Sequence, residues 1–198
     1  MKSKIITQSI AYILKIILIL MFFIAIYKND ILWSFFAWIM IIISLIPELI
    51  RKFSKINLLY LFDIFIVLAL IFHMGNGLYD VCSIFPLYNK FTHFFSALVV
   101  AFIVMVFLPI INDDFIKNKP KFLFDVIVTT MALGVLWEFL EWNADHFFGL
   151  NTQLGLTDTM GDLFADTLGG LFITFIGWFL IKTQAFKKMI KDIKKELD

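Results

Sequence analysis

The chain has 198 residues, of which 61% are hydrophobic and 17% are charged, and 25 of them are phenylalanine. A soluble domain of this size could not cover so much apolar surface with so few charged side chains, so a water-soluble globular fold is excluded. The net charge is +1, and the single cysteine, Cys82, excludes an internal disulfide and a cysteine-based metal site.

Mostly apolar runs recur along the chain, and each is near the length of about 20 residues that a helix needs to cross a bilayer. We therefore predict an all-α membrane protein, a bundle of six transmembrane helices that forms a single domain over residues 1–181. Prolines are expected at span ends or in loops, because proline lacks a backbone N–H donor. The spans are expected at about 8–27, 31–47, 57–75, 91–111, 122–142 and 158–181.

The basic residues predict the orientation, because loops rich in lysine and arginine stay in the cytoplasm. Of the 17 basic residues, all except Lys28 and Lys90 are assigned to the two termini and to the second and fourth loops. Both termini of this multi-pass cell-membrane protein are therefore expected in the cytoplasm. Residues 182–198 are predicted to form a basic amphipathic tail, which is either a helix on the inner leaflet or a solvated charged segment.

Ionisable residues gather at the outer ends of the last three spans, at a depth where lipid cannot solvate them. They share helical faces and, at a rise of about 1.5 Å per residue, most lie within roughly 12 Å of the outer boundary. In chain order they are Lys90, His93, Glu138, Glu141, Asp145, Asp158, Asp162 and Asp166. Lys90 and His93 cannot neutralise this many carboxylates. Either several carboxylates are protonated, or a cation lies among them.

Carboxylates together with an imidazole are a ligand set for Zn²⁺, Mn²⁺ or iron, whereas Mg²⁺ or Ca²⁺ would use the oxygens alone. We predict that a divalent metal ion is bound, and that Glu141 or Asp158 is the general base. The predicted metal ligands are His93, Glu138, Asp162 and Asp166. Simpler interpretations stay open, because Asp158 is also a candidate N-cap of the sixth span, and the deeper groups could only hydrogen-bond between helices.

The segments YNKFTHFFSAL, GVLWEFLEWNADHFFGLNTQLGL and TDTMGDLFADTLGG occur in this order. Together they resemble the YjdF-like family of prokaryotic multipass membrane proteins and, more distantly, the VanZ-like family. The resemblance covers about residues 46–181 and adds Asn151 and Gln153 to the polar positions named above. It implies envelope chemistry, with Lys90, Asp145 and Gln153 as substrate-binding residues. Asn89 departs from the family pattern, in which an aspartate precedes the lysine.

Three functions are compatible with this pattern. The first is a metal-dependent envelope enzyme that acts on a lipid or lipid-linked substrate. The second is a cation- or proton-coupled transporter, for which Asp63 and Asp125 would extend the polar path inward. The third is a structural or regulatory membrane component. Separately, the small pair Ala165 and Gly169 is compatible with a close neighbouring helix, either from the same chain or from a second copy in a homo-oligomer. Membrane lipids are the expected partners, and no nucleic acid is expected.

Overall fold

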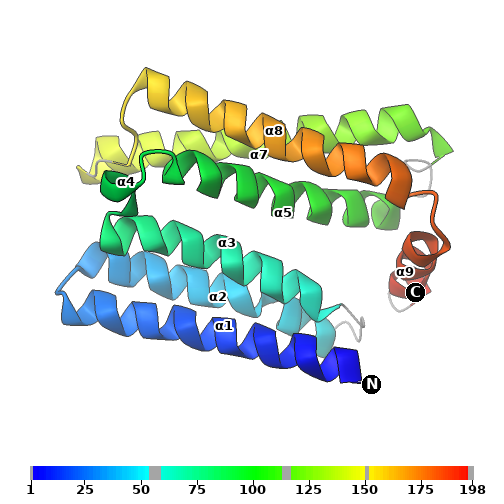
Figure 1. Cartoon of the computed structure of the whole chain (residues 1–198), viewed down its shortest axis with the longest axis horizontal. Helices are drawn as coiled ribbons and strands as arrows, with labels where there is room; N and C mark the ends of the chain where they lie inside the picture. The colour runs from blue at the N-terminus through cyan, green and yellow to red at the C-terminus, as the bar shows by residue number, and fades with distance from the viewer. Residues whose placement is uncertain (1, 54–58, 113–116, 150–151, 196–198) are drawn as a thin grey trace. The chain divides into compact units, whose positions relative to one another are not determined.

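The computed structural model describes residues 2–53, 59–112, 117–149 and 152–195, which contain helices and no β-strand (Figure 1). Within these ranges six helices are long and apolar enough to cross a membrane. They are α1 (Lys2–Tyr27), α2 (Ile31–Phe53), α3 (Tyr60–Tyr79), α5 (Tyr88–Ile111), α7 (Lys119–Phe148) and α8 (Leu156–Leu180). The predicted all-α fold with six apolar helices is therefore confirmed. Two shorter helices are α4 (Val81–Ile84) and α9 (Gln184–Lys195).

The chain divides into two compact units, and each is described by itself. Unit 1 comprises Met1–Tyr88 and Asp192–Asp198, and unit 2 comprises Asn89–Lys191. In unit 1, α1, α2 and α3 pack against one another, as Figure 1 shows. In unit 2, α7 packs along α8. The single domain over residues 1–181 and the cytoplasmic position of the termini stay predictions.

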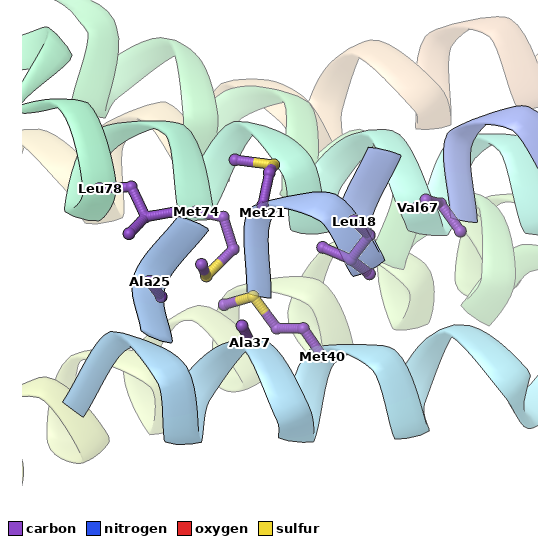
Figure 2. Packing of buried hydrophobic residues seen from close by; sticks show 8 residues of the cluster. All are labelled: Leu18, Met21, Ala25, Ala37, Met40, Val67, Met74 and Leu78. Atoms are coloured by element: carbon purple, nitrogen blue, oxygen red, sulfur yellow. The ribbon is translucent and has the colours of Figure 1, made fainter. Parts of the chain in front are cut away.

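The core of unit 1 is built from aliphatic and methionine side chains that α1, α2 and α3 point toward one another (Figure 2). Its members are Leu18, Met21, Ala25, Ala37, Met40, Val67, Met74 and Leu78. Unbranched methionine adapts to irregular gaps between helices, whereas the alanines allow the backbones to approach. Gly77 has the same effect, because a Cβ there would overlap the indole ring of Trp33. Small residues therefore allow α1, α2 and α3 to pack closely around the core of unit 1.

A second feature of unit 1 is a group of four charged residues, Lys15, Glu48, Arg51 and Asp63, called the Asp63 cluster, of which Lys15 and Asp63 are buried. Asp63 has no exposed surface, and Lys15 is 7% exposed. Lys15 Nζ lies 2.9 Å from Asp63 Oδ1 and 3.2 Å from Glu48 Oε2. Arg51 donates two hydrogen bonds of 2.7 Å to the two oxygens of Asp63. The cluster pairs two cations with two anions and joins α1, α2 and α3.

This cluster explains why α2 is longer than the second span predicted from the sequence. The helix does not end at Pro47 but continues to Phe53, so Pro47 and Arg51 lie inside α2 rather than at a span end and in a loop. Glu48 and Arg51 are three residues apart, and continued helix presents both on one face. Lys15 likewise lies within α1 and not at its amino-terminal end. Ion pairs with Lys15 and Asp63 hold this extra turn.

In unit 2, glycines on α8 allow its neighbours to approach closely. A Cβ at Gly169 would lie 2.6 Å from the backbone oxygen of Phe94 and 2.8 Å from Cβ of Ala97, both on α5. A Cβ at Gly177 would lie 2.6 Å from Sδ of Met105, also on α5. The small side of α8 that includes Gly169 therefore has an intrachain neighbour, α5.

The tail contains α9, whose apolar residues Phe186, Ile190 and Ile193 are buried, whereas Lys187 and Lys191 are exposed. The predicted amphipathic pattern is present within Gln184–Lys195. Leu197, the last member of the expected apolar stripe, lies outside the described residues. The position of α9 on the inner leaflet stays a prediction.

Candidate metal centre

Contacts between side chains bring together the beginning of α5, the last third of α7 and the beginning of α8, all in unit 2. Antiparallel neighbours arise naturally, because α7 ends only a few residues before α8 begins. His93 comes from the second turn of α5, Glu138 and Glu141 from α7, and Asp162 and Asp166 from α8. The three stretches that the sequence placed at one depth thus meet at one end of the unit.

Three of these residues could share one metal ion. His93, Glu138 and Glu141 each offer a ligand atom, and the three atoms lie within 4.8 Å of one another. His93 and Glu138 are 3% and 4% exposed, whereas Glu141 is half-buried. The two glutamates are three residues apart, so one face of α7 presents both. We call these three residues the metal group.

Glu138 lacks the partners that a buried carboxylate needs. Both of its oxygens are buried, and neither accepts a hydrogen bond of normal geometry from a described residue. Thr159 and Gln153 are its polar neighbours, and Oγ1 of Thr159 is itself buried without such a bond. A buried carboxylate without hydrogen bonds is costly, so native proteins almost always pair it or place it against an ion. The carboxylate oxygens of Glu138 and the hydroxyl oxygen of Thr159 are therefore buried without a hydrogen bond of normal geometry among the described residues.

The imidazole of His93 lies between two aspartates of α8. Its Nδ1 is 3.4 Å from Oδ1 of Asp166, and its Nε2 is 3.7 Å from Oδ1 of Asp162. Metal-binding histidines commonly direct their second nitrogen at a carboxylate, which orients the ring and makes it a better ligand. Gly134 leaves the space for Asp166, because a Cβ there would lie 2.5 Å from Asp166 Oδ2. Asp166 is thus placed to orient His93.

Lys90 binds two carboxylates of α8, those of Asp158 and Asp162, in an arrangement that we call the Lys90 clamp. Its Nζ contacts Oδ1 and the backbone oxygen of Asp158, and lies 2.9 Å from Oδ1 of Asp162. Asn89 donates to both oxygens of Asp162 at 3.1 and 3.0 Å. The side chain at position 89 therefore has a direct role as a donor, which an aspartate could not fill. Gly161 gives the Lys90 side chain room, since a Cβ there would lie 2.8 Å from Cε.

The N-cap of α8 is Gly155 and not Asp158, because the helix already begins at Leu156. Asp158 lies in the first turn, and its Oδ2 accepts a hydrogen bond of 3.3 Å from the N–H of Leu154. Its carboxylate is therefore engaged both by Lys90 and by the preceding loop.

Asp145 holds the segment between α7 and α8. It accepts hydrogen bonds of 2.7 Å from both the N–H and Oγ1 of Thr152, and one of 2.8 Å from the N–H of Gln153. With three donors on one carboxylate, Asp145 acts as an anchor of this loop. Asn151, which the resemblance to known families also marks, lies outside the described residues.

Trp137 has a contact with the metal group that sequence reasoning missed. Its indole Nε1 donates a hydrogen bond of 2.7 Å to Oε1 of Glu141. The four-residue spacing of Trp137 and Glu141 on one helix was a signal that could have revealed the contact. The bond fixes one oxygen of Glu141 and leaves the other available to the metal group.

Comparison with known proteins adds the family. A family model described as "Predicted membrane protein (DUF2238)" matches residues 10–183. The chain belongs to this family. Neither the curated proteins nor the solved structures include a significant match to it.

Membership in DUF2238 agrees with the six apolar helices, and the family description names no activity. Of the four ligands expected from the sequence, His93 and Glu138 lie in the metal group, whereas Asp162 and Asp166 contact the imidazole. Glu141, expected as a general base, offers the third ligand atom.

Proposed function

We propose that this protein is a divalent-metal-dependent enzyme of the cell envelope, with the metal ion bound by His93, Glu138 and Glu141. The observation that carries the proposal is the carboxylate of Glu138, which is 4% exposed and accepts no hydrogen bond of normal geometry from the described residues. A cation among the three ligand atoms would satisfy it. No other group in the described cluster has this property together with an imidazole and a second carboxylate at ligand distance.

The ligand set favours Zn²⁺, Mn²⁺ or Fe²⁺, since an imidazole with carboxylates suits these ions better than Mg²⁺ or Ca²⁺. Three protein ligands would leave a coordination position for water, and a metal ion of this kind lowers the pKa of bound water so that hydroxide forms near neutral pH. Glu141 is the half-buried member of the group, so access to the ion is expected past its side chain. Asp158, already engaged by Lys90, is supported less well as a general base.

The position of the site favours a lipid or a lipid-linked substrate. His93 lies five residues from the beginning of α5, roughly 8 Å along the helix. With both termini in the cytoplasm, as the basic residues predict, this end of unit 2 faces the outer leaflet of the cell membrane. The resemblance to the YjdF-like and VanZ-like families supports an envelope setting as well.

The transporter alternative has less support. Asp63, one of the two acids expected to extend its path, is neutralised by Lys15 and Arg51. Asp125, the other, pairs with Lys121 at a distance of 3.0 Å. A purely structural cluster would require its buried carboxyl groups to be paired or protonated, and Glu138 accepts no hydrogen bond of normal geometry from a described residue.

Metal analysis of the purified full-length protein tests the proposal. After incubation with Zn²⁺, Mn²⁺ or Fe²⁺ and removal of free ion, the wild-type chain should retain about one ion of at least one of these metals per chain. Glu138→Gln keeps the size of the side chain but removes the charged ligand, so it should lose this ion. Asp145→Asn is the matched control, because Asp145 anchors a loop and lies outside the metal group. A wild-type chain without bound metal, or equal retention by Glu138→Gln, contradicts the proposal.

A further inference from the structure

The charges around the metal group restrict the substrate. Among the described residues of unit 2, the cationic side chain at the site end is Lys90. The next lysine on α7 is Lys121, 17 residues before Glu138 and so roughly 25 Å away along the helix. The lysines after α8 follow Leu180, which is a similar distance beyond Asp162. Arg51, the only arginine in the chain, belongs to unit 1 and binds Asp63.

Lys90 has no capacity left for a substrate anion. An ammonium group has three N–H donors. The Nζ of Lys90 has three oxygen acceptors, namely the backbone oxygen and Oδ1 of Asp158 and Oδ1 of Asp162. Its side chain also passes over Gly161, where a Cβ would lie 2.8 Å from Cε, and this confines it to the clamp. The one described lysine at this end of unit 2 therefore already has an acceptor for each of its three donors.

The site stays negative even with a metal ion bound. Five carboxylates belong to the metal group or to the contacts of His93 and Lys90, namely those of Glu138, Glu141, Asp158, Asp162 and Asp166. With all five ionised and His93 neutral, Lys90 and one divalent ion supply three positive charges, which leaves a net charge of −2. Proteins that recognise phosphate normally offer arginine or lysine donors to its oxygens. Here the approaching phosphate would meet excess negative charge and, among the described residues of unit 2, no available lysine or arginine donor.

Building on the proposed metal site, we infer that its substrate presents an uncharged carbonyl, an ester or amide of a lipid, and not a phosphate group. In ester hydrolysis the oxygen of water bonds to the carbonyl carbon, and the bond from that carbon to the alcohol oxygen breaks. A proton passes from the water, through a carboxylate of the site, to the departing alcohol oxygen. Ester and water become acid and alcohol, and no electrons are exchanged. The acid product is an anion, which the negative site would repel and so release.

Paramagnetic NMR with Mn²⁺-loaded full-length protein in micelles tests this inference, because Mn²⁺ broadens the resonances of molecules that reach it. The neutral probe is monobutyrin, a soluble glycerol ester observed by ¹H NMR, and the anionic probe is inorganic phosphate observed by ³¹P NMR. Glu138→Gln at the same total Mn²⁺ concentration reports the broadening that does not depend on the site. We expect the wild type to broaden monobutyrin above this control and to leave phosphate at the control level.

Asp158→Asn supplies the matched change in charge. It lowers the negative charge by one and releases Lys90 from its charged Asp158 partner, so phosphate should now be broadened at least about tenfold more than by the wild type. Phosphate that reaches the wild-type site as readily as monobutyrin would overturn the inference, and so would a site that neither probe reaches. Failure to bind Mn²⁺, Zn²⁺ or Fe²⁺ at all would instead overturn the proposed function, so the two failures are distinguishable.

Discussion

Two groups of buried charges lie within the apolar helices, and they differ in balance. In the Asp63 cluster of unit 1, Lys15 and Arg51 face Asp63 and Glu48, and both oxygens of Asp63 accept charged hydrogen bonds. In unit 2, Lys90 is the single described lysine among five carboxylates, and no described residue donates a hydrogen bond of normal geometry to Glu138. One group is closed, and the other is incomplete.

This difference shows how an ionisable residue in a membrane helix should be interpreted. Such residues are costly in lipid and mark function by default. The Asp63 cluster satisfies every one of its buried charges internally, so helix assembly alone accounts for it. The metal group does not, and the proposed cation would supply the missing partner. The imbalance of charge and the missing partner, more than burial itself, point to a ligand.

The largest effect is expected from Asp63→Asn. This change leaves Lys15 and Arg51 buried beside a neutral amide, and breaking a buried ion pair from one side typically costs about 3–5 kcal/mol. The free energy of unfolding in micelles should fall by about this amount, while the metal content of the folded fraction is unchanged. Glu48→Gln is the control, since the Glu48 side chain is 41% exposed and Lys15 keeps Asp63. Equal losses of stability in both variants would show that the ion pairs of Asp63 do not dominate the stability of the cluster.

Glu138→Met should have the opposite sign in the metal-free protein. It replaces a buried carboxylate that accepts no hydrogen bond of normal geometry from the described residues by an apolar side chain of similar length. Leaving such a polar group unsatisfied costs about 1–3 kcal/mol, so the variant should be more stable than the metal-free wild type by up to that amount. With metal added, only the wild type should gain stability. Chemical unfolding with and without chelator measures both terms, and destabilisation of the metal-free variant would indicate that Glu138 has protein partners after all.

The sequence predicts the helices and the depth at which the charged residues of unit 2 lie. Each apolar run specifies a helix locally, and a rise of about 1.5 Å per residue places His93, Glu138 and Asp162 at one depth. The rotation of each helix about its axis is a tertiary property, which periodicity restricts only to a broad face. Sequence reasoning therefore grouped Asp162 with Glu138 as metal ligands. In the structure, the ligand atoms that lie within 4.8 Å of one another come from His93, Glu138 and Glu141.

The ion pairs of unit 1 could not be predicted from the sequence, because they too depend on how the helices pack. Lys15 and Asp63 are 48 residues apart, and no local pattern pairs them. Proline usually ends or kinks a helix, so Pro47 predicted the end of a span. The ion pairs of Glu48 and Arg51 across to other helices support the turn that follows it, and they become visible only when the three helices are packed.

A steric change tests whether Asp166 positions His93. In Gly134→Ala the new Cβ would lie 2.5 Å from Asp166 Oδ2, so the carboxylate must move away from the imidazole. Overpacking of this kind costs about 1–3 kcal/mol, and the loss of the second carboxylate contact should weaken metal binding about tenfold. Gly170→Ala is the control, because its Cβ would meet Thr130 Cγ2 at 3.4 Å, an ordinary contact. Unchanged metal affinity in Gly134→Ala would remove Asp166 from the site.

The smallest effect is expected from Trp137→Phe, which deletes the indole N–H that binds Oε1 of Glu141 at 2.7 Å. Trp137 is 37% exposed, so the loss of packing should be minor and the unfolding free energy nearly unchanged. Without the bond, the side chain of Glu141 rotates freely in the metal-free protein. Fixing it on the ion then costs conformational entropy, so metal affinity should fall about tenfold. Competition with a chelator of known affinity measures the dissociation constant. Trp142→Phe is the matched control, since Trp142 stacks on His146 at a centroid distance of 5.2 Å and lies outside the metal group. If both variants bind the ion as tightly as the wild type, a contact other than the hydrogen bond from Trp137 holds Glu141 in place.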